Sequence, residues 1–440
     1  KLAAGGRHTC AILDNGDVKC WGYNWNGQLG TGSATTSNVN VPPTNAIDLG
    51  TGRTAVALSA GYDHTCAILD NGDLKCWGAD TFGVMANGGH YNAGYTEEHA
   101  PAAIDLGTGR TAVAVSAGHS HTCAILDNGD LKCWGDGNRG QNGWGYSGNS
   151  GHLTSVPTNA INLGTGRTAV AVSAGEEHTC AILDNGDLKC WGSDHYGQMG
   201  DGYPTASALT PPTTAINLGT GRTAVAVYSG YLHICALLDN RDLKCWGQAP
   251  EGTFDVVPST ALNLGTGLTA VAVSAGADFT CVILNNGDVK CWGGDNHGQL
   301  GDGGPAWTYP NPSTGTTAPP TNPINLGTGR TAVAISSGQY HACAILDNGD
   351  MTCWGTNNRG QLGSNSGSGE TQPLLVSGSN SWNTATTPVI WDTHPALPAG
   401  MSISGGMISG TPSVYAKNQT YTIYANQSGY STTHELYFSV

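Results

Sequence analysis

The sequence predicts an all-β protein in which seven copies of one antiparallel sheet form a circular or stacked array. Three observations support this prediction. A segment like 6–22 returns six more times, at intervals of about 46 to 62 residues, which is typical of repeat architectures. Each copy contains two cysteines with nine residues between them and a tryptophan after the second cysteine. Each copy also has short apolar stretches separated by turn residues, as expected of strands.

The second copy shows the expected order of elements. Residues 54–61 alternate small alanines with branched residues, which is typical of a strand that is buried on both faces. Residues 64–69 and 74–78 give two further strands. A fourth, weaker strand is expected before each repeat, as at 43–49. Four short strands per copy would make one antiparallel blade.

The fourteen cysteines have two interpretations, as zinc ligands or as disulfides. Zinc ribbons use tighter pairs, with two to four residues between the cysteines, so the constant wider spacing favours disulfides across a hairpin. Disulfides persist in oxidising compartments, so we expect an extracellular or cell-surface protein. The predicted pairs are Cys10 with Cys20, Cys66 with Cys76, Cys123 with Cys133, Cys180 with Cys190, Cys235 with Cys245, Cys281 with Cys291, and Cys343 with Cys353.

The cysteine register selects the turn of each hairpin. A two-residue Asn15-Gly16 loop would place Cys10 opposite Trp21. A three-residue loop over 14–16, with a left-handed glycine, places Cys10 opposite Cys20, at a separation that a disulfide can close. Trp21 then points to the other side of its strand, so sulfur and indole should face opposite neighbouring blades.

Charge and composition limit the classes of partner. The net charge is −15, only 11% of residues are charged, and most of the arginines and lysines recur at fixed repeat positions. Because these positions lie on rings, the basic residues should be spread out, which disfavours nucleic-acid binding. No apolar run is long enough to span a membrane. The start at Lys1, without Met or a signal core, leads us to expect a processed or incomplete N-terminus.

The repeats resemble those of the regulator of chromosome condensation family over roughly residues 1–378. The resemblance rests on the Ala-Gly-x-x-His lead, the Asn-Gly turn, the Trp-Gly pair and the Gly-Gln-Leu-Gly segment, as at 27–30. It implies a seven-bladed β-propeller of four-stranded antiparallel blades, each with one disulfide. The paired cysteines depart from the nuclear founding member and resemble a secreted prokaryotic branch. Chromatin binding and nucleotide exchange are therefore not carried over.

The pattern ends near residue 378, and residues 379–440 are expected to form a second, small domain. The segments 397–400 and 408–412 make it similar to the immunoglobulin-like modules of bacterial and archaeal surface proteins, which implies a small β-sandwich. Two alternating strands are expected at 421–425 and 435–440. About sixty residues without a disulfide make a marginal core. We expect the module to be incomplete or to be completed by a strand from a partner.

Six histidines share one repeat position, and the Asp-Asn-Gly-Asp turns carry calcium-like oxygens. Blade geometry should keep the histidines apart, so we expect them to bond to nearby backbone and not to hold a metal. The turns have too few ligands for calcium and lack a distal bidentate Glu. No catalytic residue, metal site or cofactor is predicted. The six histidines are His8, His64, His121, His178, His233 and His341.

The spacers after each Trp-Gly pair escape repetition and carry aromatic residues among Gly, Asn and Ser. This composition is typical of rigid recognition surfaces, although the same aromatics could cap blade edges. The spacers start at one point of each blade, so they should gather on one side of the ring. The candidate binding residues are Trp25, Tyr91, Tyr95, Trp144, Tyr146, Tyr203, Trp307 and Tyr309. Asn418 and Asn426 begin N-glycosylation tripeptides, which are used in some proteins and arise by chance in others.

These observations favour a non-enzymatic extracellular or cell-surface interaction or structural protein. Its partner would be a protein, or another copy that adds through β-strand edges and so builds a surface filament. The alternative is a monomeric secreted binder or inhibitor that uses loops on one face. An enzyme acting on polysaccharides is less favoured, because no acid and base pair can be named.

Overall fold

The computed structural model describes residues 1–32, 38–88, 102–148, 151–202, 207–249, 252–254, 256–304, 318–378, 390–394, 401–404, 407–410, 419–427 and 430–438. The chain divides into two compact units, Lys1–Trp382 and Asn383–Val440, and each is described by itself. The division predicted between residues 378 and 379 stays a prediction.

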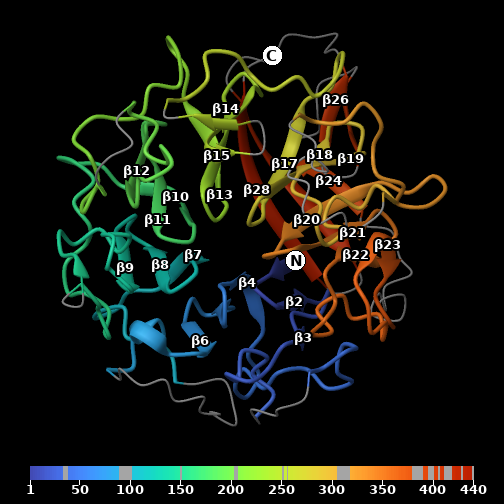
Figure 1. Ribbon diagram of the computed structural model, residues 1–440, viewed down its shortest axis with the longest axis horizontal. Coiled ribbons are helices and arrows are strands. Elements are labelled where there is room, and N and C mark those ends of the chain that lie inside the picture. The colour runs from blue at the N-terminus through green and yellow to red at the C-terminus, as the bar shows by residue number, and fades with distance from the viewer. Residues whose placement is uncertain are drawn as a thin grey trace. The chain divides into compact units, whose positions relative to one another are not determined.

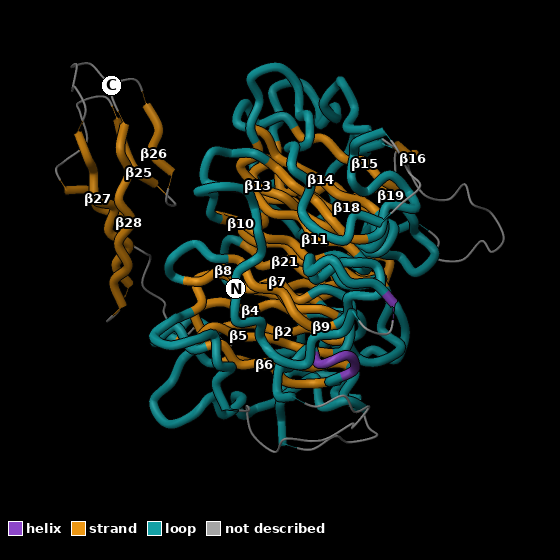
Figure 2. The backbone as a smooth tube through the Cα atoms, turned by 90° about the vertical axis from the view of Figure 1, so that its left-hand side faces the viewer, coloured by secondary structure: helices purple, strands orange, loops and turns teal. Residues whose placement is uncertain are grey.

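Seven antiparallel sheets follow one another around a ring in the first unit, from blue to orange in Figure 1. We call them blades 1 to 7 in chain order. The strands run between two regions of loops (Figure 2). The innermost strands are β1 (Leu2–Ala4), β4 (Ala55–Ala60), β7 (Ala112–Ala117), β10 (Ala169–Ala174), β13 (Ala224–Ser229), β17 (Ala270–Ala275) and β20 (Ala332–Ser337).

Each innermost strand pairs with the first arm of the cysteine hairpin, and the second arm follows. The first arms are β2 (His8–Ile12), β5 (His64–Leu69), β8 (His121–Leu126), β11 (His178–Leu183), β14 (His233–Leu238), β18 (Phe279–Leu284) and β21 (His341–Leu346). The second arms are β3 (Val18–Gly22), β6 (Leu74–Gly78), β9 (Leu131–Gly135), β12 (Leu188–Gly192), β15 (Leu243–Ala249), β19 (Val289–Gly293) and β22 (Met351–Gly355). One short helix, η1 (Thr81–Gly83), follows β6.

The prediction of a fourth strand in every blade is wrong for the described residues. Only blades 5 and 7 have one, β16 (Gly252–Phe254) and β23 (Glu370–Leu375). Blades 1, 3 and 4 have a single bridge there, such as Gly22 with Val39. Residues 43–49, the expected strand, make one backbone bond, from Ile47 N to Val18 O at 2.9 Å. Prolines in these segments lack the N–H that a ladder needs, so the chain runs along the edge without forming a strand.

The predicted hairpin register is confirmed. Cys10 pairs with Cys20 across β2 and β3, and the other six cysteine pairs have the same register. Leu13 N donates to Asp17 O at 2.8 Å and Gly16 has φ of 82°, as the three-residue loop requires. All fourteen cysteines are disulfide-bonded, with no free thiol. Arg241 takes the left-handed glycine position in blade 5, at φ of 68° and a cost of about 1 kcal/mol.

Neighbouring blades pack sulfur against indole, as predicted. The Cys10–Cys20 face of blade 1 lies in one buried cluster with Trp77 of blade 2. Trp21 of blade 1 packs in turn against Cys343 and Cys353 of blade 7, which closes the ring. The tryptophans are therefore core residues.

The indole N–H also bonds to the blade before it at Trp21, Trp77, Trp134, Trp191, Trp246 and Trp354. Trp77 Nε1 donates to the carbonyl of Gln28 at 3.0 Å. Trp134 of blade 3 donates to the carbonyl of Val84, because the spacer after blade 2 lacks the Gly-Gln-Leu-Gly segment. The contact therefore needs a backbone carbonyl at this place and not a glutamine side chain. The other indole bonds run from Trp21 to Gln361, Trp191 to Gln141, Trp246 to Gln198 and Trp354 to Gln299.

The repeat histidines bond between blades, which corrects the expectation that they bond to nearby backbone. His8 Nε2 lies 2.8 Å from Thr65 Oγ1 of blade 2, and Thr65 Oγ1 donates to Gln28 O at 2.9 Å. Since the threonine proton is used there, we infer that His8 donates from Nε2. The sequence does not show this contact, because His8 and Thr65 come close only when blades 1 and 2 pack side by side. The same contact joins His64 to Thr122, His121 to Thr179, His233 to Thr280 and His341 to Thr9.

Two blades break this pattern. Blade 6 and its neighbour have changed at both the histidine and the threonine position, whereas blade 4 keeps a histidine that has lost its threonine. Phe279 replaces the histidine of blade 6, and the residue that faces its position in blade 7 is Ala342. His178 of blade 4 meets Ile234, and its Nε2 has no hydrogen-bond partner among the described residues. The histidine and the threonine therefore act as a matched pair.

The second unit contains two antiparallel sheets. Strand β27 (Gln419–Gln427) lies between β24 (Ile390–His394) and β28 (Tyr430–Phe438), and β25 (Met401–Ser404) pairs with β26 (Met407–Gly410). The strands expected at 421–425 and 435–440 overlap β27 and β28. The immunoglobulin-like assignment stays a prediction.

The matched pair gives a test by exchange between blades. His121→Phe should lower the free energy of unfolding by about 2 kcal/mol, because a larger ring would press on Thr179 Oγ1, now 2.7 Å from His121 Nε2. Adding Thr179→Ala, which copies the Phe279 and Ala342 pair, should recover at least half of the loss. Urea unfolding measures both. A double variant no more stable than the single one would contradict the pairing.

Stability should fall as the pH drops below about 6.5. Burial lowers the pKa of His8, His64, His121, His178 and His341 to about 3 and that of His233 to about 4. Unfolded histidines titrate near 6.5, so between these values the unfolded state binds more protons and each histidine disfavours folding. Four carboxyl groups oppose this trend, because burial raises the pKa of Asp63, Glu176, Asp278 and Asp295, that of Asp295 to about 6, but the six histidines outnumber them.

The urea midpoint at pH 7 and pH 5 checks this expectation. The His121→Phe/Thr179→Ala variant is the control, since it should take up about one proton fewer on unfolding. A midpoint that rises between pH 7 and pH 5 would contradict the assignment of neutral buried histidines.

Candidate binding face at the mouth of the central channel

The first unit has two chemically different loop faces. One face, the turn face, carries the Asp-Asn-Gly-Asp hairpin turns and the Gly-Thr-Gly-Arg loops. The other, the mouth face, carries the turns between the innermost strands and the first hairpin arms, together with the start of each spacer. Tyr23 N donates to Arg7 O at 3.0 Å, which fixes the first spacer beside the first of these inner turns.

The charges of the turn face are used within each blade. Arg53 pairs with Asp70 at 3.1 Å, and four other blades repeat this pair. Blade 6 has Leu268 and Asn285 at the two positions, so both members changed together. In each turn the asparagine amide also bonds to the second aspartate, as Asn15 does to Asp17 at 2.8 Å. These side chains are therefore paired with one another within the blade.

The repeat lysines also bond to backbone. Lys132, Lys189, Lys244 and Lys290 are buried, and each Nζ donates to the carbonyl of a leucine in the loop that enters the same blade from the preceding one. They hold the crossing chain against the second hairpin arm and present no basic patch.

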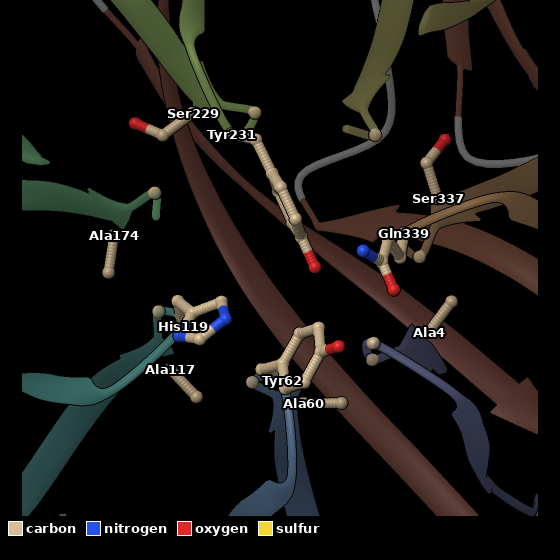
Figure 3. Close-up of a pocket in the computed structure, with 18 of the residues that line it drawn as sticks. Ala4, Ala60, Tyr62, Ala117, His119, Ala174, Ser229, Tyr231, Ser337 and Gln339 are labelled. Atoms are coloured by element: carbon tan, nitrogen blue, oxygen red, sulfur yellow. The ribbon is translucent and has the colours of Figure 1, made fainter. Parts of the chain in front are cut away.

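Residues from all seven blades meet at the mouth of the central channel. A cavity of about 100 Å³ opens there, lined by the glycines of the inner turns and by Tyr62, His119, Tyr231 and Gln339 (Figure 3). The glycines are required, because a Cβ at Gly61 would collide with the His64 ring and the carbonyl of Gly118. The side chain that follows each glycine is therefore the one that surrounds the mouth.

A ring of serines lies further along the innermost strands. Ser59 Oγ accepts from Ala117 N at 2.9 Å, and Ser116, Ser173, Ser274 and Ser336 accept from the next blade in the same way. Tyr228 takes this position in blade 5. These bonds tie the innermost strands together and frame a second cavity of about 200 Å³.

Aromatic rings and one arginine form a continuous row across the mouth face. Arg7 Nη2 donates to Tyr62 OH at 2.8 Å. Tyr62 stacks on His119 with centroids 4.2 Å apart, and His119 meets Tyr231 edge-on at 6.1 Å. Burial lowers the pKa of His119, so its ring is neutral at neutral pH. Tyr23 extends the row outward, between Arg7 and Arg359, and stacks on Trp25.

Partly buried carboxylates lie among these rings. Asp63 accepts from Gln28 Nε2 at 3.0 Å and Asp278 accepts from Gln299 Nε2 at 3.2 Å. Burial raises the pKa of both carboxyl groups, and it also raises that of Glu176, where the charge of Glu177 adds to the effect. Glu177 itself has a cation, Arg139, at 3.6 Å.

The Tyr231 hydroxyl is enclosed and points into the cavity (Figure 3). It makes no hydrogen bond to any described residue. Burial raises its pKa, and the nearby Tyr62 and Glu176 raise it further, so it stays protonated and sits in a negative field.

The predicted binding residues fall into three groups. Trp25 and Tyr146 are 51% and 57% exposed. Trp144 is half-buried, and its Nε1 donates to Cys133 O at 3.0 Å, so it caps its blade. The other candidates, Tyr91, Tyr95, Tyr203, Trp307 and Tyr309, lie outside the described residues. For glycosylation, Asn426 lies in β27 opposite Ser431, and Asn418 is outside the described residues.

Sequence reasoning missed Tyr62, His119, Tyr231 and Gln339. A signal was present, because the pair of residues that follows the inner-turn glycine is different in each copy while its neighbours repeat. Among the residues that the structure describes, no three His, Cys, Asp or Glu side chains are grouped to hold a metal. Within the same ranges, no helix is long and apolar enough to cross a membrane.

Comparison with known proteins identifies the repeat. Residues 1–303 match the RCC1-like domain family and residues 332–361 match the regulator of chromosome condensation (RCC1) repeat. The ultraviolet-B receptor UVR8 of Arabidopsis thaliana is 28% identical over 58% of this chain and 54% of its own length. The secretion-regulating guanine nucleotide exchange factor of Bos taurus is 28% identical over 57% of this chain and 52% of its own length. The chain thus matches about half the length of these relatives.

Solved structures share the fold. Human WBSCR16 superposes with a TM-score of 0.69 at 21% identity, covering 82% of this chain and 94% of its own. Yeast RCC1 (Prp20), in a structure with Kap60, gives 0.64 at 19% identity, covering 82% and 83%. With a family match over most of the repeats and the same ring of blades in these structures, the chain belongs to the RCC1-like domain family.

Proposed function

We propose that this chain is a non-enzymatic extracellular or cell-surface protein that binds a protein partner through its mouth face. Relatives support a binding role. Yeast RCC1 was crystallised bound to Kap60, and a structure of Prp20p was reported with its binding properties to Gsp1p and histones. Those partners belong to those proteins. For this chain we infer only that its RCC1-like ring also binds a protein partner.

The difference between the two faces carries the proposal. The turn face repeats the same residues in most blades and uses them in internal ion pairs and hydrogen bonds. The side chains at the inner turns of the mouth face vary between blades, as at Tyr62, His119, Glu176 and Gln339, and the spacers that start from this face expose Trp25 and Tyr146. Varied aromatic and charged side chains on a rigid frame are what a specific protein interface needs.

The disulfides support an extracellular location. Seven buried bonds and no free cysteine would be maintained in an oxidising compartment and not in a reducing cytosol. An extracellular location would also allow N-glycosylation of Asn418 and Asn426, which we include in the proposal.

Thiol state tests this location. Protein taken from its source cells into denaturant with an alkylating reagent, without reductant, should carry no label on its fourteen cysteines. The same sample reduced first is the control and should label fully. Fourteen labelled thiols without reductant would overturn the extracellular assignment.

Self-association into a surface filament is the more specific form of the proposal. Strand β28 spans Tyr430–Phe438 and pairs with β27 on one side, and no described strand pairs with its other edge. An unpaired edge can accept a strand from another chain, which would join copies through their C-terminal units. The alternative is a monomer that uses the mouth face alone.

Particle size separates these two forms. Purified full-length protein, measured by light scattering and electron microscopy, should form particles larger than one chain if β-strand edges join copies. If the protein is monomeric at all concentrations, the filament hypothesis is wrong and the monomeric binder is the form that remains. A Tyr62→Ala/Tyr231→Ala variant is the matched control, because edge pairing should not depend on the mouth.

A further inference from the structure

We infer that the mouth cavity binds one positively charged side chain, a lysine or an arginine, presented by a protein partner. This inference rests on the proposed function and adds the chemistry of its central contact. Four properties of the mouth support it: its size, its aromatic wall, the partly compensated negative charge around it and its unpaired hydroxyl.

The cavity has the size of a side chain and not of a metabolite. Its volume of about 100 Å³ would hold a few water molecules, whereas pockets for small-molecule ligands usually measure roughly 300–1,000 Å³. It also opens at the centre of a face, where a projecting residue of a partner can enter. The end of a lysine or arginine fits such a site.

The walls of the cavity suit a cation. Tyr62, His119 and Tyr231 surround it with aromatic rings, whose faces attract positive charge (Figure 3). The protein already uses this chemistry at the rim, where the Arg7 guanidinium lies 5.5 Å from the Tyr62 ring centroid and donates to its hydroxyl. The neutral imidazole of His119 adds a ring without adding a competing charge.

The charge around the cavity is negative and only partly compensated. Arg7 attracts Asp63, and Arg139 pairs with Glu177. Glu176 occupies the same repeat position as Tyr62, His119, Tyr231 and Gln339, and neither it nor Asp278 makes an ion pair within the described ranges. Partial burial disfavours both ionised carboxylates, so an incoming cation would stabilise them.

The enclosed hydroxyl of Tyr231 would complete the contact. Its oxygen can accept a hydrogen bond from an ammonium or guanidinium group, and it now has no partner among the described residues. An anionic group would be repelled by Glu176 and Asp63. An apolar group would leave the hydroxyl and the carboxylates without compensation.

Amino-acid amides serve as probes. Full-length protein with 13C-labelled tyrosine rings should show shifts for Tyr62 and Tyr231 on addition of N-acetyl-lysine methylamide or N-acetyl-arginine methylamide, with a dissociation constant on the order of 1–10 mM. N-acetyl-norleucine methylamide matches lysine in length without charge, and N-acetyl-glutamate methylamide reverses the charge. Neither should shift these rings.

Two variants test the assigned groups. Glu176→Gln should weaken lysine-amide binding by about fivefold, the size expected of one partly exposed charge pair. Asp184→Asn changes the net charge equally on the turn face and should leave binding unchanged. Tyr231→Phe should weaken binding without altering the Tyr62 spectrum of the free protein. Equal binding of the norleucine amide, binding of the glutamate amide, or no shift with any probe up to its solubility limit would overturn the inference.

Failure of this inference is distinguishable from failure of the proposed function. If the Tyr62→Ala/Tyr231→Ala variant no longer binds the partner and no basic probe binds the wild-type protein, the mouth face remains the binding site. Only the inference that a basic side chain enters the cavity would then be overturned. A partner retained by that variant but lost on disruption of the turn face would overturn the mouth face itself.

Discussion

The contact between the tryptophan of one blade and the backbone of the blade before it holds the ring together. Each repeat indole is buried against a disulfide hairpin, and at six of these tryptophans the structure shows the N–H donating to a carbonyl in the preceding spacer, as Trp77 does to Gln28. A buried indole N–H without a partner would cost about 1–3 kcal/mol. The first residues of each spacer must therefore be placed to accept it. The rest of the spacer does not contact the indole N–H, so its sequence can vary.

The repeat positions work as pairs, as their departures show. Phe279 faces Ala342 where the other blades have histidine facing threonine, and Leu268 occurs with Asn285 where others have an arginine–aspartate pair. In both cases both members of the contact changed together, so neither member keeps a buried polar group whose partner has been lost. His178 facing Ile234 is the exception, and its Nε2 is left unpaired. A single blade can therefore change without disturbing the ring if both members of a contact change together.

The structure divides its two faces between stability and recognition. On the turn face, ion pairs and amide bonds within each blade hold the hairpins and crossing loops. On the mouth face the glycine of each inner turn is fixed by the packing of the repeat histidine, or of Phe279 in blade 6, but the next side chain lies outside that contact and is free to differ. Six residue types therefore occupy seven equivalent positions around one axis. A symmetric frame thus presents an asymmetric surface, which is what selective binding requires.

The sequence by itself determined the local structure. Two cysteines with nine residues between them specify the hairpin, its three-residue turn and its disulfide, because all the atoms concerned belong to neighbouring residues. The absence of a fourth strand in most described blades, and the bonds of the histidines to the next blade, depended on chain segments from other blades. The mouth was decided by tertiary structure alone. Tyr62, His119 and Tyr231 belong to different blades, and they meet only because closing the ring brings every inner turn to one axis.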